Sequence, residues 1–253
     1  QGLSAVTAAL GAGFEVSADL ITAVPGQDAE RDLHALGATG APHVSVYTLT
    51  IEPHTPFALR GVRTDEAREA EDFALAEAIL ARYGLARYEV SSHARPGHES
   101  RHNAVYWSGA HFLNLGPSAA GFLPLEGGPG TETETGAERV GALGVRVVNP
   151  PIKAWLAGAP PERFLVTPAA YALDLLSTGL RTRRGVDLAA LEARSGIALE
   201  GRYGALLDEL TGEGWLERSA GALRATPAGL LQLNGVLRRF FAATPDPHYR
   251  PLE

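Results

Sequence analysis

The sequence contains neither cysteine nor methionine among its 253 residues. Without cysteine, the chain forms no disulfide, offers no thiolate nucleophile and supplies no cysteine ligand to zinc or to an iron-sulfur cluster. A chain of this size ordinarily carries several methionines, including the one that starts translation. We therefore expect the natural protein to begin before Gln1, and the missing methionines to reflect truncation, disorder or omitted modified residues.

Long apolar runs and an excess of basic residues are also missing. No stretch reaches the roughly 18 to 20 uncharged apolar residues that span a bilayer, and residues 1–14 lack the features of a signal peptide. The formal net charge of −7 disfavours general binding to nucleic acid, which depends on clustered Lys and Arg. We expect a soluble, cytoplasmic protein with no membrane span and no nucleic-acid partner.

The first half of the chain alternates short apolar runs with helical patterns. This pattern predicts strands at residues 14–24, 43–51 and 86–91, and helices at residues 29–36 and 64–83. Such alternation is typical of an α/β fold with a parallel sheet and right-handed crossovers. Three strands cannot close a barrel, because both edges of the set would stay open. We therefore predict the later part of a partial (β/α) barrel over residues 1–160, with its N-terminal strands missing.

The second half has a different pattern. Gly127–Gly136 (GGPGTETETG) is predicted to be an exposed turn or hairpin tip. Beyond it the sequence predicts a tight hairpin around Gly221 and four helices, at residues 168–180, 186–195, 199–213 and 228–241. Three helices, a small hairpin and a last helix resemble a winged-helix module. We predict a second, smaller, winged-helix-like α+β domain at residues 161–253.

The segment from Asp19 to Gln27 (DLITAVPGQ) is the first candidate site. It predicts a strand that ends in a Pro-Gly turn, and ligands of parallel α/β folds bind at the carboxyl ends of strands. The carboxylate of Asp19 is suited to a ribose, because its two oxygens accept hydrogen bonds from both vicinal hydroxyls. The alternative is that Pro25 and Gly26 only shape a turn and that the backbone satisfies Asp19.

Two further segments carry groups that are able to do chemistry. In YTLTIEPHTPF, Glu52 and His54 form a conceivable acid-base pair, although a solvated strand end is the favoured interpretation. In HESRHNAVYW, two histidines, an amide and two large rings suit a planar macrocycle or a metal. A packed loop anchored by Trp107 is the favoured alternative, and Pro96 and Gly97 argue against a helix that presents both His98 and His102 to zinc.

Two less specific features complete the set. The small residues of Phe112–Phe122 (FLNLGPSAAGF) permit close approach of backbone to a ligand or to another strand. Arg181, Arg183 and Arg184 form a basic cluster, but acidic residues surround it in sequence. This arrangement favours a structural cap or a partner surface over a DNA-reading helix.

Taken in order, these stretches resemble a known family. DLITAVPGQ, HVSVYTLTIEPHTPF, RYEVSSHARPGHESRHNAVYW and LNLGPSAAGF are similar to successive signature stretches of the oxygen-independent coproporphyrinogen III oxidase-like radical-SAM proteins. LSTGLRTRRGVDLAAL and LNGVLRRFF resemble the C-terminal domain of that family. The HN..YW and TIEP.TPF stretches look more like its heme chaperone branch than like the decarboxylating oxidase.

The resemblance implies cofactors and site residues. Family members bind S-adenosylmethionine and a [4Fe-4S] cluster, which three cysteines of a CxxxCxxC loop hold. Asp19 would contact the ribose of S-adenosylmethionine, Pro25, Gly26 and Gln27 would line its pocket, and Leu49 would lie beside the adenine. The HN..YW residues are the candidate heme contacts, namely His102, Asn103, Tyr106 and Trp107. The implied partners are heme and the proteins that accept it.

This chain departs from the family in ways that limit the inference. It has no cysteine, so it supplies no metal ligand for the cluster and no residue is assigned to catalysis. Smaller departures are Ser92, His93, Asn114, Ser118 and Ala120 within the signature stretches. Two alternatives stay open beside the heme chaperone. One is decarboxylation of coproporphyrinogen III to protoporphyrinogen IX, and the other is a non-enzymatic module that binds a partner protein or DNA.

Overall fold

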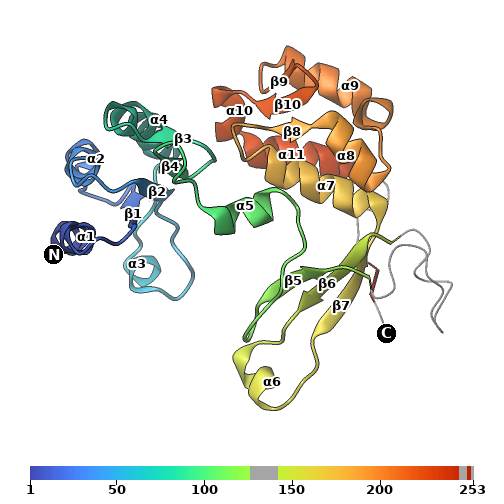
Figure 1. Cartoon of the computed structure of the whole chain (residues 1–253), viewed down its shortest axis with the longest axis horizontal. Coiled ribbons are helices and arrows are strands. Elements are labelled where there is room, and N and C mark those ends of the chain that lie inside the picture. Colours follow the sequence, from blue (N-terminus) through green and yellow to red (C-terminus); the bar gives the residue numbers. More distant parts are fainter. Residues whose placement is uncertain (126–141, 245–249, 252–253) are drawn as a thin grey trace. The chain divides into compact units, whose positions relative to one another are not determined.

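A computed structural model describes residues 1–125, 142–244 and 250–251 (Figure 1). The chain forms two compact units, residues 1–100 and residues 101–253. Compactness thus divides the chain at residue 100, and the division predicted at about residue 160 stays a prediction. The predicted hairpin tip at Gly127–Gly136 lies outside the described residues. Among the residues described, no helix is long and apolar enough to cross a membrane.

Unit 1 is a small α/β layer. Its parallel strands are β1 (Ser17–Thr22) and β2 (His43–Thr48), which pair from Ser17 with His43 to Thr22 with Thr48. Helix α2 (Ala29–Gly37) connects them, as the sequence predicted, and α1 (Gly2–Gly11) precedes β1. The long helix α4 (Glu66–Arg82) begins after Asp65, whose carboxylate accepts from the backbone nitrogen of Ala67 at 3.0 Å.

The third predicted strand of this unit is wrong in extent and in pairing. Residues 86–91 were expected to form one parallel strand, but β3 covers only Ala86–Arg87 and β4 (Ser92–Ala94) follows it. The sheet order is β1-β2-β4-β3, and β4 runs antiparallel to both β2 and β3. The reason is a reversal after Tyr88, where the Glu89 carboxylate accepts from the backbone nitrogen of Ser91 at 3.1 Å.

The two faces of the sheet in unit 1 differ in chemistry. Side chains of successive strand residues point to opposite faces, so every second residue of β1 and β2 shares a face. One face packs under α2 and α4 in a cluster of buried apolar residues, namely Ala18, Leu33, Leu36, Ala41, Val44, Ala76, Ile79, Leu80 and Leu85. The other face carries Ser17, Asp19, His43 and Ser45 and is therefore polar.

Unit 2 contains an antiparallel sheet of order β11-β7-β6-β5. Its strands are β5 (Ala120–Leu123), β6 (Gly144–Val148), β7 (Glu162–Val166) and β11 (Arg250–Pro251). The short helix α5 (Arg101–Trp107) precedes this sheet in the chain, and α6 (Ile152–Leu156) lies between β6 and β7. The sequence analysis had predicted none of β5, β6, α6 and β7.

The rest of unit 2 is the winged-helix-like module (Figure 1). Its helices are α7 (Pro168–Gly179), α8 (Leu188–Ser195), α9 (Leu199–Gly212), α10 (Pro227–Leu231) and α11 (Leu233–Ala242). Strands β8 (Val186–Asp187), β9 (Leu216–Ser219) and β10 (Ala222–Ala225) form a sheet of order β8-β10-β9. The predicted hairpin turns at Ala220 and Gly221, which both have positive φ.

Two predicted helices of the module need correction. The helix expected from Val186 begins at Leu188, because Val186 and Asp187 pair with β10 and the Asp187 carboxylate caps the helix. The helix expected over residues 228–241 is two helices separated at Gln232. The fold class itself is confirmed, because the mixed α/β fold has open sheets, as in a partial barrel, together with a C-terminal module.

Candidate functional site

The turn after β1 is fixed by the Gln27 side chain. Its Nε2 donates to the carbonyl oxygen of Ile21 at 2.9 Å and to the Asp32 carboxylate at 3.2 Å. Its Oε1 accepts from the backbone nitrogen of Val24 at 3.3 Å. Gln27 is thus occupied in holding the turn, whereas Pro25 and Gly26 stand exposed at its tip. The turn offers a ligand its backbone and its shape rather than a free amide side chain.

Helix α4 braces this turn from behind. The buried carboxylate of Asp72 accepts from the backbone nitrogen of Ala23 at 2.9 Å and from the Arg68 Nε at 3.4 Å. The Arg68 Nη2 donates to the carbonyl oxygen of Gln27 at 2.8 Å. Ala23 has a positive φ of 57°, which is costly for a residue with a Cβ. Sequence reasoning missed both Arg68 and Asp72, whose contacts with the turn span more than 40 residues.

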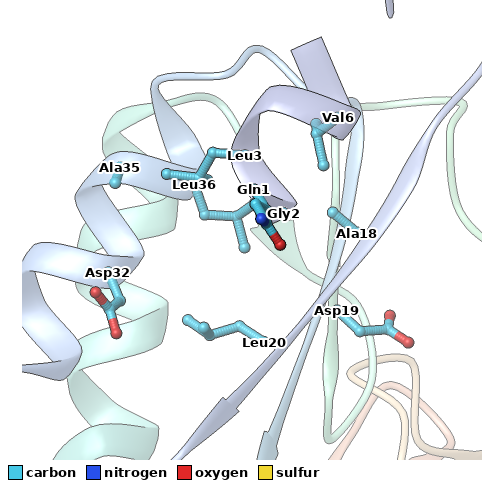
Figure 2. A pocket seen from close by; sticks show the side chains of 10 residues that line it. All are labelled: Gln1, Gly2, Leu3, Val6, Ala18, Asp19, Leu20, Asp32, Ala35 and Leu36. Carbon is cyan, nitrogen blue, oxygen red and sulfur yellow. The ribbon is translucent and has the colours of Figure 1, made fainter. Parts of the chain in front are cut away.

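Asp19 lies on the polar face of the sheet in unit 1. Figure 2 shows a cavity between α1, α2 and β1, into which the apolar side chains of Leu3, Leu20 and Leu36 project. Its volume is about 330 Å³, and the Asp19 carboxylate points away from it. A ligand held by Asp19 would therefore bind on the opposite face. Leu49 extends the pairing of β2 beyond its end, with its nitrogen 2.9 Å from the Thr22 carbonyl oxygen.

The same polar face carries a chain of hydrogen bonds around His43. Its Nδ1 lies 2.8 Å from the Ser17 hydroxyl, and its Nε2 lies 2.8 Å from the Tyr88 hydroxyl. The Tyr88 hydroxyl also accepts from the backbone nitrogen of Ser100 at 3.2 Å. Burial lowers the pKa of His43 and raises the pKa of Tyr88, so both groups stay neutral near pH 7.

Sequence reasoning missed this chain of hydrogen bonds, although a signal for it exists. In HVSVYT, the polar residues His43 and Ser45 alternate with Val44 and Val46, and period-two alternation places each set on one face. The Ser92 hydroxyl donates to the Ser45 hydroxyl at 3.3 Å and extends the polar face onto β4. This face therefore combines the Asp19 carboxylate with several neutral hydrogen-bonding groups.

Glu52 and His54 lie beyond β2 in an exposed loop. The loop ends at the one-turn helix α3 (Pro56–Leu59), which Thr55 caps. The Thr55 hydroxyl donates to the carbonyl oxygen of Glu52 at 2.7 Å, so this contact uses the backbone of Glu52. The exposure agrees with a solvated strand end, and an acid-base role for the pair stays a prediction.

The HN..YW residues lie on α5, with His102 and Asn103 in its first turn and Tyr106 and Trp107 at its end. The His102 ring is exposed and packs edge-to-face on Tyr106, with ring centroids 5.0 Å apart. Tyr106 packs in the same way on Phe112 at 4.7 Å. An accessible imidazole thus lies at the end of a row of three rings in edge-to-face contact. Such edge-to-face contact favours one orientation of the imidazole ring, while the residue stays exposed.

Trp107 has a different role in the same motif. It lines a small cavity of about 170 Å³ together with residues of α7, β8 and α8, among them Leu175, Val186 and Arg194. Its indole nitrogen is buried, in contrast to the exposed His102 ring. The predicted packed loop is instead the helix α5, and Trp107 packs this helix against the module. His102 and Tyr106 remain at the surface.

The structure gives no support to a zinc site here. His98 precedes α5 and pairs with the carboxylate of Glu15. Within the residues that the structure describes, no group of three His, Cys, Asp or Glu side chains is placed to hold a metal ion. An exposed histidine beside aromatic rings suits an axial ligand of a porphyrin better than a site for a bare cation.

Comparison with known proteins shows which proteins this chain resembles in sequence and in fold. Residues 166–231 match the model of the HemN C-terminal domain. The fold is similar to that of coproporphyrinogen III oxidase HemN from Escherichia coli, which is described as a radical SAM enzyme. The alignment covers 94% of this chain and 57% of the HemN chain. The TM-score is 0.65 at 15% sequence identity, which shows a shared fold. In sequence and in fold, the chain is similar to the coproporphyrinogen III oxidase-like radical-SAM proteins.

Curated proteins with similar sequences are named heme chaperones. The chain is 29% identical over 243 residues to the heme chaperone HemW of Lactococcus lactis, which covers 90% of this chain and 59% of that protein. It is 39% identical over 132 residues to the heme chaperone HemW of Mycobacterium tuberculosis, which covers 49% and 34% respectively. The chain thus spans at most about three fifths of the length of these relatives.

Proposed function

We propose that this chain forms part of a heme chaperone, which binds heme at α5 and passes it to acceptor proteins. The carrying observation is the exposed His102 stacked on Tyr106, on a helix that the neighbouring Trp107 anchors. An imidazole nitrogen is a common axial ligand of heme iron, and flat rings beside it suit the macrocycle. The similarity to proteins named heme chaperones supports the same function.

The residues of this chain fit S-adenosylmethionine but not a [4Fe-4S] cluster. For S-adenosylmethionine, Asp19 would hold the ribose, and Pro25, Gly26, Gln27 and Leu49 would line the pocket. The exposed carboxylate on a polar face suits vicinal hydroxyls. A [4Fe-4S] cluster does not fit, because its usual ligands are cysteine thiolates and the chain has none. We therefore derive no radical step from the residues of this chain.

A hemin titration tests the proposal. Addition of hemin to the full chain should give a shifted Soret band with a saturable one-to-one end point. His102→Ala should lose that shift, because it removes the proposed axial nitrogen. The matched control is His54→Ala, which removes another exposed histidine far along the chain from α5. Equal titrations of wild type and His102→Ala would disprove the assignment of this ligand.

Two assays distinguish the alternatives. A coproporphyrinogen decarboxylase would release protoporphyrinogen IX when the complete protein receives S-adenosylmethionine and a reductant, and a chaperone would not. A partner- or DNA-binding module would retain its binding after hemin binding at α5 is removed. Part of the basic cluster is already engaged within the module, since the Arg181 guanidinium donates to the Ser177 carbonyl oxygen. This contact disfavours a DNA surface there.

A further inference from the structure

Arg194 of α8 reaches the C-terminal end of α5. Its Nη1 donates to the carbonyl oxygen of Ser108 at 2.7 Å, and its Nη2 donates to that of Gly109 at 2.8 Å. Its Nη2 also donates to the Tyr171 hydroxyl, which in turn donates to the Gly109 carbonyl oxygen at 3.0 Å. The last carbonyls of a helix lack intrahelical partners, so one guanidinium satisfies groups that α5 cannot pair by itself.

Packing fixes the same end of α5 independently of these hydrogen bonds. Gly109 has a φ of 62°, and a Cβ built on it would lie 2.5 Å from the Leu175 Cδ2. Trp107 lines a cavity with residues of α7, β8 and α8. The Arg194 guanidinium lies 5.3 Å from the centre of the Tyr171 ring. The end of α5 is therefore held by the Arg194 guanidinium, by the close packing of Gly109 on the Leu175 side chain and by the Trp107 ring.

We propose that Arg194 is a positioning residue, which holds α5 so that His102 presents its imidazole to heme. This inference rests on the proposed heme-binding function. His102 lies about two turns before Ser108, so a loosened C-terminal end would shift the imidazole and its stack on Tyr106. Arg194 and Tyr171 both belong to the residues that match the HemN C-terminal domain. The proposal thus gives that domain a task, which is to brace the helix that carries the heme ligand.

The test compares Arg194→Ala and Arg194→Lys with the matched control Arg202→Ala in the full chain. Arg202 is also an exposed arginine of the module, near the ring of Tyr203. Arg194→Lys keeps the charge but loses the fork that serves several acceptors at once. If Arg194→Ala does not fold, Tyr171→Phe tests the same hydrogen-bond network, because it removes one hydroxyl and keeps the ring. Each variant is measured by amide hydrogen exchange of residues 101–110 and by hemin titration.

We expect Arg194→Ala to accelerate amide exchange at residues 104–110 and to weaken hemin binding by about tenfold, the loss typical of a charge-assisted hydrogen bond. Arg194→Lys and Tyr171→Phe should show smaller changes, and Arg202→Ala should match wild type. The ferric heme spectrum should also lose part of its histidine-ligated character in Arg194→Ala, which a general loss of stability would not produce.

The possible failures are distinguishable. If wild type does not bind hemin, both the proposed function and the role of Arg194 in heme binding are wrong. The amide exchange data still report whether Arg194 stabilises the end of α5. If wild type binds hemin through His102 but Arg194→Ala exchanges and binds like wild type, only the role of Arg194 is overturned. Faster exchange in Arg194→Ala with unchanged hemin affinity and spectrum would also overturn it.

Discussion

The Asp72 carboxylate accepts a hydrogen bond from the backbone nitrogen of Ala23 at 2.9 Å, across 49 positions of the chain. Asp72 is buried on α4, and Ala23 follows directly after β1 with a φ of 57°. The acceptor, Asp72, thus comes from a helix that is remote in sequence. The donor, Ala23, lies in a turn whose positive φ costs free energy unless other contacts stabilise it. The turn proposed to contact S-adenosylmethionine depends on this distant carboxylate for its conformation.

Asp72→Ala should therefore destabilise unit 1 by about 2 to 3 kcal/mol, because it leaves the Ala23 nitrogen buried without an acceptor and removes the acceptor of the Arg68 Nε. Amide exchange of residues 17–27 measures the effect. Asp72→Asn retains an acceptor oxygen and should cost clearly less. Equal losses in the two variants would show that the hydrogen bond to Ala23 contributes little.

His43 predicts a dependence of stability on pH. Burial lowers its pKa in the folded chain, against the opposing influence of Glu89, Asp19 and Glu99, whereas the unfolded chain takes up a proton near the ordinary value of about 6.5. A group with a depressed folded pKa favours folding above the unfolded value and loses this contribution as the pH falls. Unit 1 should therefore become less stable between about pH 7 and pH 5.5.

The variant that isolates this effect is His43→Gln, which keeps hydrogen-bonding atoms and does not titrate. Denaturation followed by far-ultraviolet circular dichroism at several pH values should show a flatter pH dependence in His43→Gln than in wild type. Identical slopes would mean that other groups carry the acid sensitivity.

Gly229 is predicted to tolerate no side chain. A Cβ built on it would lie 1.8 Å from the Trp215 carbonyl oxygen, and backbone atoms cannot move aside as the end of a side chain does. Gly229→Ala should cost about 3 kcal/mol, at the upper end of overpacking effects. The matched control is Gly235→Ala in α11, where no atom lies within 4 Å of the added Cβ. That change should stabilise the module by about 0.5 to 1 kcal/mol.

Urea denaturation followed by tryptophan fluorescence measures both glycine variants. All three tryptophans lie in unit 2, so this signal reports on that unit alone. Destabilisation by both variants would contradict the role of the close contact at Trp215.

Tyr106 should contribute to heme binding through its ring rather than through its hydroxyl. The ring packs edge-to-face on both His102 and Phe112, and such aromatic pairs contribute about 0.5 to 1.5 kcal/mol each. Hemin titration should therefore show near wild-type affinity in Tyr106→Phe and about a tenfold loss in Tyr106→Ala. A loss of similar size in Tyr106→Phe would point instead to the hydroxyl.

Local signals made much of this fold predictable from the sequence. The helix predicted at residues 64–83 forms as α4, and the carboxylate of Asp65 accepts from the first free amides of this helix. Gly221 predicted the hairpin of the module, since its φ of 80° favours glycine. By contrast, the HN..YW stretch was predicted to be a packed loop, and it forms the helix α5. The structure separates Trp107, which packs against the module, from the exposed His102.

Features that depend on distant partners were not predictable in this way. Strand β4 is three residues long and exists because it pairs with β2, so no periodicity could reveal it. The link from Ser17 to His43 spans 26 positions, and the link from His43 to Tyr88 spans 45. Arg194 and Ser108 are 86 positions apart. The alternation in HVSVYT shows which residues share a face with His43, but a single sequence contains no local sign of the partners in these contacts.

Strand β1 has a further consequence for work with this chain. Within the residues that the structure describes, β1 pairs only with β2, so the amide and carbonyl groups along its other side have no strand beside them. A bare edge of this kind is a template on which another strand can add, in the same chain or in a neighbouring copy. We therefore expect the monodispersity and the storage lifetime of a preparation to depend on what covers the six residues of β1.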